Sequence, residues 1–514
     1  MKKIILLILL INKMTLAQNT FVPDDNFERA LIQQGYDSEP LDDYVPTANI
    51  STIKSLSIQL KGIEDLTGIE EFTSLEELDV TDNFLTSIDV SKNKKLTRLL
   101  ISDNQLTELN ISKNVALTQL YINNNRLTSL NVTNNIALKN LGLSNNNISD
   151  IDLSKNTLLS TLHLSENKIT NIDISKNTLL SLFFIYKNSL TSLDVSKNPS
   201  LSTLNIHNNQ ISTIDITKNI ALKKLIASGN KLEVIDISNN TALEHLDLTS
   251  NMLNQLGTSK NTKLIFLLIS DNKLTQLDIS KNFVLQNLYV YTNQLNHLDL
   301  SKNIKLTHFF GDYNNFTDLN ISKNTELNFI SLRYNQLKSL DISKNINLNG
   351  LYIDFNQLTH FDISNNAKLD FFEINNNLLT SLNLKSGNYK NLSPVMFQNP
   401  NLTCIQVDDE TYSNTHWRSQ KDISASFKEN CTTASLKEIT LVDFNIFPNP
   451  TKNYLKLQTR FSIEKTEIYN LQGQIVATYN TNTPITISSL ANGIYLLKAY
   501  TKNGNSSVKR FIKY

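Results

Sequence analysis

The sequence predicts a mainly β fold, in which a long solenoid of parallel strands is followed by a small antiparallel β-domain. Two observations carry this prediction. One pattern of apolar residues recurs every 21 residues through most of the chain, as in proteins built from stacked coils. Residues 438–514 abandon that pattern for short alternating strands separated by turn residues.

The first 17 residues have the composition of an export signal. Lys2 and Lys3 precede an apolar run, and Thr15 and Ala17 are small residues at the positions that a signal peptidase reads. We therefore expect residues 1–17 to be removed and the mature chain to be secreted or attached to the cell surface. No segment approaches the roughly 20 apolar residues of a membrane span, so no transmembrane segment is expected in the mature chain.

The charge balance excludes some classes of partner. The chain has 48 basic and 48 acidic side chains, and so no net field that would attract nucleic acid. Its only cysteines are Cys404 and Cys431, which excludes a zinc site built from cysteine pairs. We expect no nucleic-acid partner, no metal and no cofactor.

Residues 18–74 are expected to cover the start of the solenoid with a short helix and an irregular first repeat. The stretch Asp25–Glu28 has the pattern of a capping box, in which the side chains of the first turn bond to free backbone N–H groups. Phe27, Ala30 and Leu31 follow at helical spacing, and Gly35 is a stop signal.

Residues 75–389 consist of fifteen 21-residue repeats without an insertion. The motif Leu-Asp-Ile-Ser-Lys-Asn, or a close variant, marks each copy from Ile88 to Leu382. Each copy contains two half-units in which apolar and polar residues alternate with period two, as in a strand with one buried face. We expect the coils to pair in parallel, with one sheet for each half-unit.

The first half-unit ends in asparagine in every copy, for example at Asn104 and Asn251. Where the chain leaves a strand, its backbone groups lack ladder partners, and a short amide can bond to them. We interpret these asparagines as structural residues and not as a ligand site.

Residues 390–437 are predicted to form a C-terminal cap and linker. The apolar period stops there, and Cys404 and Cys431 both fall in this stretch. In an oxidising compartment the two cysteines are candidates for a disulfide.

Residues 438–514 are predicted to form a separate small β-sandwich of the Ig-like type. A strong hairpin signal at residues 502–505 separates its last two strands. The expected strands are Tyr454–Leu457, Glu467–Asn470, Gln474–Tyr479, Ile485–Ile487, Gly493–Thr501 and Ser506–Tyr514.

The repeat resembles the nested 21-residue class of bacterial leucine-rich repeats, with the consensus L-x-x-L-x-L-x-x-N-x-L-x-x-L-D-L. The match covers Leu75–Tyr389, and the clearest departure from it is Leu256-Gly257-Thr258. The resemblance implies a leucine-rich-repeat solenoid.

The tail resembles the type A C-terminal sorting domain of the type IX secretion system. The matching segments are Pro448-Asn449-Pro450, Ile468–Gly473, Leu490–Tyr495 and the basic end Val508–Tyr514, in which Pro448, Asn449, Pro450, Gly493, Tyr495 and Lys509 carry the motif. The resemblance implies export across an outer membrane by the type IX machinery of a Bacteroidetes-type bacterium, followed by surface attachment or release.

The two half-units differ in what they present to solvent. The second is nearly constant, with rows of aspartate and lysine such as Asp152 and Lys155, and we interpret it as scaffold. The first half-unit varies and carries aromatic residues at positions expected to point outward, mostly in the C-terminal half of the solenoid. These candidates for ligand binding are Tyr121, Phe184, Tyr186, Phe266, Tyr289, Tyr291, Phe310, Tyr313, Phe329, Tyr334, Tyr352, Phe355 and Phe371.

Exposed aromatic residues gathered on one rigid sheet are typical of a contact with a protein or a glycan. The leading hypothesis is a secreted or cell-surface protein that binds a protein ligand, as in adhesion. The alternative is a surface protein that captures polysaccharide, and a hydrolase is a remote third. The histidines are scattered outside any catalytic motif, so no enzyme activity and no catalytic residue are predicted.

Overall fold

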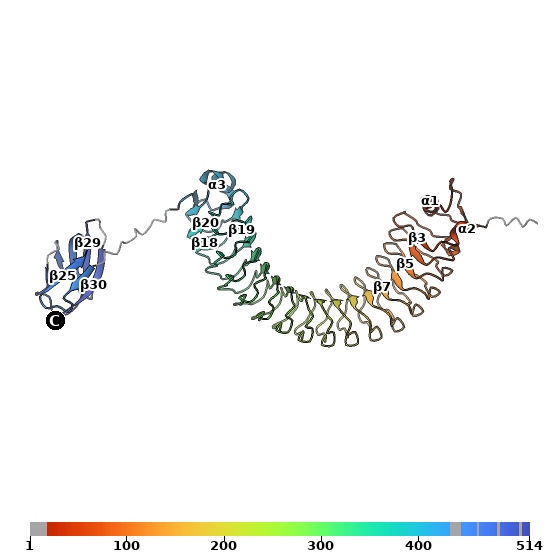
Figure 1. Cartoon of the computed structure of the whole chain (residues 1–514), viewed down its shortest axis with the longest axis horizontal. Coiled ribbons are helices and arrows are strands. Elements are labelled where there is room, and N and C mark those ends of the chain that lie inside the picture. The colour runs from red at the N-terminus through yellow and green to blue at the C-terminus, as the bar shows by residue number, and fades with distance from the viewer. Residues whose placement is uncertain (1–17, 432–443, 460–461, 481–483, 503–505) are drawn as a thin grey trace, which may run out of the picture. The chain divides into compact units, whose positions relative to one another are not determined.

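The computed structural model describes residues 18–431, 444–459, 462–480, 484–502 and 506–514. The predicted export signal, the start of the tail domain and the turn of the predicted hairpin lie outside the described residues. The chain divides into two compact units, one that extends to Glu429 and one that contains the tail strands (Figure 1). No helix among the described residues is long and apolar enough to span a membrane.

The repeats form the predicted solenoid of parallel strands. Each coil contributes a three-residue strand whose middle residue is buried and pairs in register with its neighbours, as Leu204 pairs with Phe183 and Leu225. The resulting open sheet, here called the long sheet, runs through every coil of the solenoid. Its strands are β3 (Ser55–Ser57), β4 (Glu77–Asp79), β5 (Arg98–Leu100), β6 (Gln119–Tyr121), β7 (Asn140–Gly142), β8 (Thr161–His163), β9 (Leu182–Phe184), β10 (Thr203–Asn205), β11 (Lys224–Ile226), β12 (His245–Asp247), β13 (Phe266–Leu268), β14 (Asn287–Tyr289), β15 (His308–Phe310), β16 (Phe329–Ser331), β17 (Gly350–Tyr352), β19 (Phe371–Glu373) and β21 (Ser393–Val395).

Apolar side chains stack from coil to coil to fill the interior. Leu99, Leu162 and Leu267 occupy the same position of three coils, and none of them has exposed surface. The stacked side chains form one continuous core that includes both ends of the solenoid. Within this unit the coils follow a curved path, and the long sheet lines its concave side (Figure 1).

The asparagine that ends each first half-unit holds two coils together. Asn251 Nδ2 donates to the carbonyl oxygens of Ala227 and Leu248, both at 3.0 Å, and its Oδ1 accepts from Leu232 N at 3.0 Å. Asn104 makes the corresponding contacts, including a bond of 3.0 Å from its Nδ2 to Val80 O in the preceding coil. These bonds confirm that the asparagines are structural.

The second half-units form a sheet only at the C-terminal end of the solenoid, so the expectation of two long sheets is wrong. Side chains bond to the backbone of these half-units. Asn114 Nδ2 donates to Val90 O at 2.9 Å and Asn93 O at 3.0 Å, and Asn110 Oδ1 accepts from Ser112 N at 3.1 Å. The short sheet consists of β18 (His360–Asp362), β20 (Ser381–Asn383), β22 (Cys404–Gln406) and β23 (Ser426–Lys428).

The repeat that departs from the consensus has a local compensation. Thr258 is buried in the place of the usual isoleucine, and its Oγ1 lies 2.8 Å from Asn282 Oδ1 and 2.6 Å from Asp278 O. In the other coils that carry this asparagine, as at Asn261 and Asn303, the side-chain oxygen is buried without a hydrogen-bond partner. The Thr258 hydroxyl therefore offers a hydrogen-bond donor to Asn282 Oδ1, which the apolar side chain of the usual isoleucine could not do.

The N-terminal cap contains the predicted helix, with a different capping residue. Helix α1 (Asp25–Gln33) is capped by Asp24, whose side chain accepts from the N–H groups of Asn26 and Phe27. The predicted capping box is therefore wrong by one residue. Glu28 is buried and instead accepts from Asp42 N and Asp43 N, at 2.8 and 3.1 Å. The cap also contains β1 (Asn19–Phe21), β2 (Tyr44–Pro46), α2 (Thr47–Ile50) and the 3₁₀ helix η1 (Ile69–Glu71).

The C-terminal cap continues the coils beyond the regular repeats. Strand β21 extends the long sheet, while β22 and β23 extend the short sheet. Helix α3 (Glu410–His416) and the 3₁₀ helix η2 (Arg418–Gln420) place Trp417 against Phe427, with ring centroids 6.2 Å apart. Cys404 and Cys431 are disulfide-bonded, which confirms the predicted pair.

The tail unit contains two antiparallel sheets, as expected for a small sandwich. One has the order β24-β25-β28 and the other β27-β26-β29-β30. Their inner faces share a core that includes Leu455, Ile468, Leu497 and Phe511. The strands are β24 (Phe444–Phe447), β25 (Tyr454–Thr459), β26 (Ile463–Tyr469), β27 (Ile475–Tyr479), β28 (Ile485–Thr486), β29 (Gly493–Thr501) and β30 (Ser506–Lys513).

Candidate functional site

The path of each coil decides which residues reach the concave face of the solenoid. In the coil of β14, Leu288 and Val290 point into the core, so Tyr289 and Tyr291 point outward. The next residue, Thr292, has a positive φ of 51°, and there the chain turns away from the sheet. Each coil therefore offers four outward places: two on the strand, one beyond it and one in the left-handed turn.

The thirteen predicted aromatic residues occupy all four of these places. Phe266, Phe329 and Phe371 begin their strands, whereas Tyr121, Phe184, Tyr289, Phe310 and Tyr352 end theirs. Tyr186 and Tyr291 lie two residues beyond their strands, and Tyr313, Tyr334 and Phe355 lie in the left-handed turns.

Four of these rings form a continuous ladder across neighbouring strands, here called the strand ladder. Tyr289 packs on Phe310 with ring centroids 4.6 Å apart, and Phe310 packs on Phe329 at 5.3 Å. Tyr352 completes the ladder 5.2 Å from Phe329. The predicted contiguous strip therefore exists in the coils of β14 to β17.

Three of the predicted residues, Phe184, Tyr186 and Phe266, pack on histidines and do not join this ladder. Phe184 stacks on His163 at 4.6 Å, and Tyr186 stacks on His207 at 4.3 Å. Tyr121 belongs to β6, far along the sheet from the ladder. Burial lowers the pKa of both histidines.

Three more of the predicted aromatic residues form a second stack, here called the turn ladder. Tyr313, Tyr334 and Phe355 stack with centroid distances of 4.3 and 4.1 Å. The sequence suggested that these residues lie on the strands. They do not, because the chain has already turned away from the sheet at their positions. Their φ angles are 53°, 54° and 54°, in the left-handed region.

The turn ladder is unusual for that backbone conformation. Bulky L-residues pay about 1–2 kcal/mol to adopt it, whereas asparagine, aspartate and glycine tolerate it. In most other coils this turn position is occupied by such residues, for example Asn208, Gly229 and Asp271. Four coils carry another polar residue there: Glu166, Lys187, Ser250 and Thr292. All three rings nevertheless remain exposed to solvent, Tyr313 by 53%.

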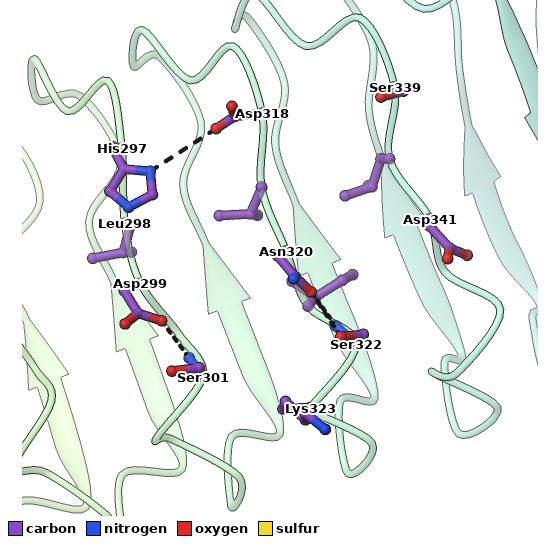
Figure 2. Close-up of a pocket in the computed structure, with 13 residues that line it drawn as sticks. His297, Leu298, Asp299, Ser301, Asp318, Asn320, Ser322, Lys323, Ser339 and Asp341 are labelled. Atoms are coloured by element: carbon purple, nitrogen blue, oxygen red, sulfur yellow. Dashed lines mark hydrogen bonds and ion pairs between the residues drawn. The ribbon is translucent and has the colours of Figure 1, made fainter.

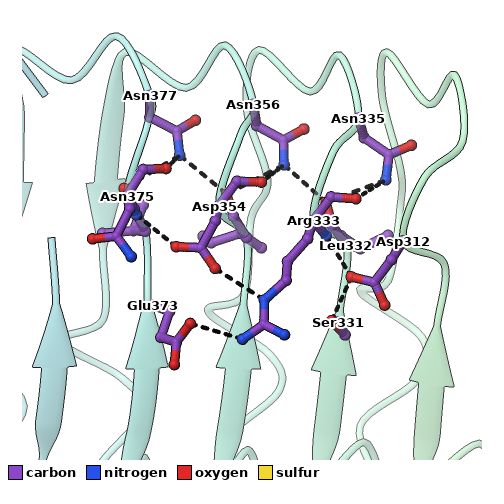
Figure 3. A network of polar contacts seen from close by, with 12 residues as sticks. Asp312, Ser331, Leu332, Arg333, Asn335, Asp354, Asn356, Glu373, Asn375 and Asn377 are labelled. Atoms are coloured by element: carbon purple, nitrogen blue, oxygen red, sulfur yellow. Dashed lines mark hydrogen bonds and ion pairs between the residues drawn. The ribbon is translucent and has the colours of Figure 1, made fainter. Parts of the chain in front are cut away.

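A charged network lies in a hollow that Phe310 of the strand ladder and the turn ladder also line, and Figure 3 shows its residues. Arg333 Nε contacts Asp354 Oδ2 at 3.0 Å, and its Nη2 contacts Glu373 Oε2 at 2.7 Å. The guanidinium carbon lies 4.1 Å from the centroid of Tyr352. Asp312 accepts from Arg333 N at 2.7 Å, so two neighbouring coils hold the arginine backbone and side chain.

Burial raises the pKa of Asp312 and Asp354 above the usual range of a carboxyl group. Asp354 also accepts from Asn375 N at 2.7 Å. Together these groups line a hollow whose rim includes Phe310 and the turn ladder.

Sequence reasoning missed this network although a signal was available. Asp312, Arg333 and Asp354 occupy one position of three consecutive repeats. Most other repeats have serine, threonine or asparagine there, as at Ser228 and Thr249. The site is marked by charged residues in three consecutive repeats, at a position that no other repeat fills with an acidic residue, lysine or arginine.

A second hollow lies over the constant half-units (Figure 2). Its carboxylates serve the local turns, since Asp299 accepts from Ser301 N at 2.8 Å and the pKa of Asp299 is lowered mainly by this bond. His297 and Asp318 approach to 3.9 Å, and both are largely exposed. The described residues contain no group of three metal-ligating side chains. This geometry fits the predicted role of the half-unit as scaffold.

The tail motif residues join the last strand to the start of the domain. Asn449 Nδ2 donates to Arg510 O at 3.0 Å, and its Oδ1 accepts from Ile512 N at 2.9 Å. Tyr495 donates to Ala491 O at 3.0 Å and stacks on Phe511. Pro448 and Pro450 flank Asn449, Gly493 pairs with Lys513, and Lys509 lies in β30 opposite Leu497.

The tail also holds a buried carboxylate that the sequence did not single out. Glu467 lies 2.6 Å from Lys465 Nζ and accepts from Tyr500 Oη at 2.7 Å and from the hydroxyl of Tyr469. The bond to Lys465 is the largest cause that lowers the pKa of Glu467 to about 2, and the bonds to the two tyrosines add to it.

Residues 445–514 match the family model of the secretion system C-terminal sorting domain. No curated protein matches the chain. Many solved structures share its fold. The functional domain of InlJ from Listeria monocytogenes is 25% identical, with a TM-score of 0.62 and coverage of 97% of this chain and 99% of that one. That domain includes a cysteine ladder, whereas the only two cysteines here lie beyond the regular repeats.

Two further structures with more distant sequences have the same fold. A leucine-rich-repeat protein of Leptospira interrogans is 23% identical, with a TM-score of 0.61 and coverage of 71% of this chain and 97% of that one. YopM from Yersinia enterocolitica is 21% identical, with a TM-score of 0.54 and coverage of 74% and 84%. The chain is therefore a leucine-rich-repeat solenoid with a sorting domain, and that domain implies secretion.

Proposed function

We propose that this leucine-rich-repeat protein with a secretion sorting tail is a secreted or surface-attached recognition protein that binds a protein partner through the concave face of its solenoid. The turn ladder carries the proposal. Tyr313, Tyr334 and Phe355 are exposed aromatic residues in a conformation that favours asparagine or glycine. Strain of this kind at an exposed position is a reason to infer a function for the side chain.

The ring geometry favours a protein partner over a glycan. Sugars stack on the faces of aromatic rings, which must therefore be open. In the turn ladder the planes of neighbouring rings are within 10° of parallel, and each ring covers a face of the next. The stacked side chains remain partly exposed, and tyrosine and phenylalanine are enriched in protein interfaces.

Structural neighbours provide further support. The plant receptor RGFR1, with a TM-score of 0.57 and 21% identity, was solved in complex with the peptide hormone RGF2. The leucine-rich-repeat ectodomain of the receptor kinase HAESA, with a TM-score of 0.53 and 21% identity, was solved with the peptide hormone ligand IDA. Repeats of this fold can therefore present a surface that binds polypeptide.

The test replaces the turn ladder with the residue that the scaffold prefers. A Tyr313→Asn, Tyr334→Asn, Phe355→Asn variant keeps the backbone conformation that Asn208 adopts at φ 52°. We expect it to lose binding in a screen of host matrix proteins while it remains folded. Unchanged protein binding, or binding to a polysaccharide panel that a Tyr289→Ala, Tyr352→Ala variant loses, would favour the glycan alternative.

Export is proposed to depend on both ends of the chain. Residues 1–17 direct the chain out of the cytoplasm, and the sorting domain directs it across the outer membrane through type IX machinery. Fractionation of cells that express the chain with and without residues 444–514 tests this part. We expect the truncated form to be retained inside the cell envelope, and its arrival at the cell surface would refute the role of the tail.

A further inference from the structure

The concave face is strongly acidic where its aromatic residues gather. In the coils that span residues 245–376, all of which the structure describes, Arg333 is the only lysine or arginine on the strands, at the residue just before each strand or at the positions just beyond it. The lysines of these coils lie in the turns that precede the strands, in those that leave the sheet, or in the second half-units. The acidic residues on the face are Asp247, Asp271, Asp312, Asp354, Asp370 and Glu373.

The earlier coils do not have this imbalance. On the same face before Ile226, five basic residues nearly balance the six carboxylates of Glu76, Glu77, Asp79, Asp82, Asp103 and Glu166. The basic residues are Arg98, Lys139, Lys187, Lys223 and Lys224. The change in charge along the sheet therefore coincides with the two aromatic ladders, although the whole chain is neutral.

The hollow between the ladders has an acceptor that the protein itself does not use. Arg333 contacts Oε2 of Glu373, and no described residue donates a hydrogen bond to Oε1. The side chain of Glu373 is about one-third exposed, so this oxygen can be reached from solvent. Asp312 adds a second carboxylate to the lining, and Phe310 and Phe355 add apolar walls.

We propose that the partner presents a basic segment to this hollow, with an arginine or lysine side chain that enters between the turn ladder and the strand ladder. This proposal rests on the proposed function and names the chemistry of its partner. The cationic group bonds to Glu373 and faces Asp312, and its aliphatic stem lies along the rings of Phe310 and Phe355. The surrounding carboxylates attract the basic segment and orient it.

A peptide series tests the proposal on the full-length protein. The probes are three fluorescein-labelled octapeptides in which glycine alternates with arginine, with citrulline or with glutamate. Citrulline has nearly the shape of arginine without its charge. We expect the arginine peptide to bind at least tenfold more tightly than the citrulline peptide in 150 mM salt, measured by fluorescence anisotropy. Its affinity should fall as salt screens the carboxylates.

Matched variants locate the binding site. Glu373→Gln keeps the shape of the side chain and should weaken binding of the arginine peptide at least fivefold. Asp299→Asn removes one carboxylate from the constant half-unit, where Asn320 already stands in a neighbouring coil, and should change the affinity less than twofold. Thermal unfolding of both variants serves as the control for folding.

Two results would overturn the proposal: equal affinities for the arginine and citrulline peptides, or equal effects of Glu373→Gln and Asp299→Asn. The peptide result and the behaviour of the turn-ladder variant together distinguish failure of the basic ligand from failure of the proposed function. If the asparagine variant of the turn ladder loses its protein partner while arginine and citrulline peptides bind alike, the concave face still binds protein but the basic ligand is wrong. If that variant keeps its partner, the proposed function itself fails.

Discussion

Replacement of Phe355 by asparagine distinguishes a ring kept for binding from a ring that stabilises the solenoid. The ring stacks on Tyr334 at 4.1 Å and is 41% exposed. Loss of the stack costs about 1 kcal/mol, and loss of its partial burial costs about 1 kcal/mol more. Asparagine recovers about 1 kcal/mol because it tolerates the left-handed conformation at φ 54°. We expect the free energy of unfolding to fall by only about 1 kcal/mol.

The measurement is urea unfolding followed by circular dichroism, with Phe309→Ala as the reference. Phe309 has no exposed surface and lies one strand position from the outward Phe310, so its truncation should cost about 3–5 kcal/mol. In a binding assay we expect the opposite order of importance, with at least a tenfold loss of partner affinity for Phe355→Asn. A loss of stability as large as that of Phe309→Ala would refute the reasoning, because the ring would then be part of the scaffold.

Three further predictions concern the scaffold and the tail. Asn251→Ala removes hydrogen bonds from buried backbone groups of two coils and should lower the free energy of unfolding by about 3 kcal/mol in a urea titration. Asn254 is exposed, and Asn254→Ala should change the free energy of unfolding by less than about 0.5 kcal/mol in the same titration. Reduction of the disulfide between Cys404 and Cys431 should destabilise the C-terminal cap by about 3 kcal/mol. The measurement is hydrogen exchange of β22 and β23, which should be faster in the reduced protein; equal exchange in both redox states would contradict this prediction. The pKa of Glu467 is lowered from 4.5 to about 2 in the folded tail, so the stability that this group contributes is complete above pH 4.5 and is lost as the pH falls toward 2. The calorimetric unfolding temperature of the tail should therefore fall over this pH range. Glu467→Gln should remove this pH dependence.

The 21-residue period was sufficient to predict the solenoid because each repeat contributes the same buried side chains. Once Leu204 is placed on a strand, the spacing places Phe183 and Leu225 beside it, as the register shows. The same argument assigned the role of Asn251, since a residue that recurs where the chain leaves every strand must serve the backbone.

The period did not reveal which half-unit forms the sheet. Both half-units alternate apolar and polar residues, but only the first pairs as a strand in every coil. Side-chain bonds to the backbone do not distinguish them, since Asn104 in the first and Asn114 in the second both donate to carbonyl oxygens of the preceding coil. Strand pairing therefore depends on backbone geometry that alternation alone does not contain.

Long-range contacts account for the error in the cap. Glu28 stands at the right spacing for a capping box, yet it accepts from Asp42 N and Asp43 N, which lie fourteen and fifteen residues away. Asp24 is then the residue left to cap α1, and its second oxygen accepts from Glu64 N and Asp65 N. A local pattern cannot show that a side chain is already committed to a distant loop.

Repeat proteins allow function to be separated from scaffold within one sequence. Residues that recur at the same position of every coil, such as Asn251, stabilise the stacking of the coils. Residues that depart from what the scaffold prefers need another cause, and the concave face has two such departures: aromatic rings in left-handed turns, as at Phe355, and consecutive charges at a position that is uncharged or histidine in the other repeats, as at Arg333. Both occur in the same coils and line the same hollow. Since neither belongs to the buried core of the solenoid, their coincidence is the reason to place the binding site there and not along the whole sheet.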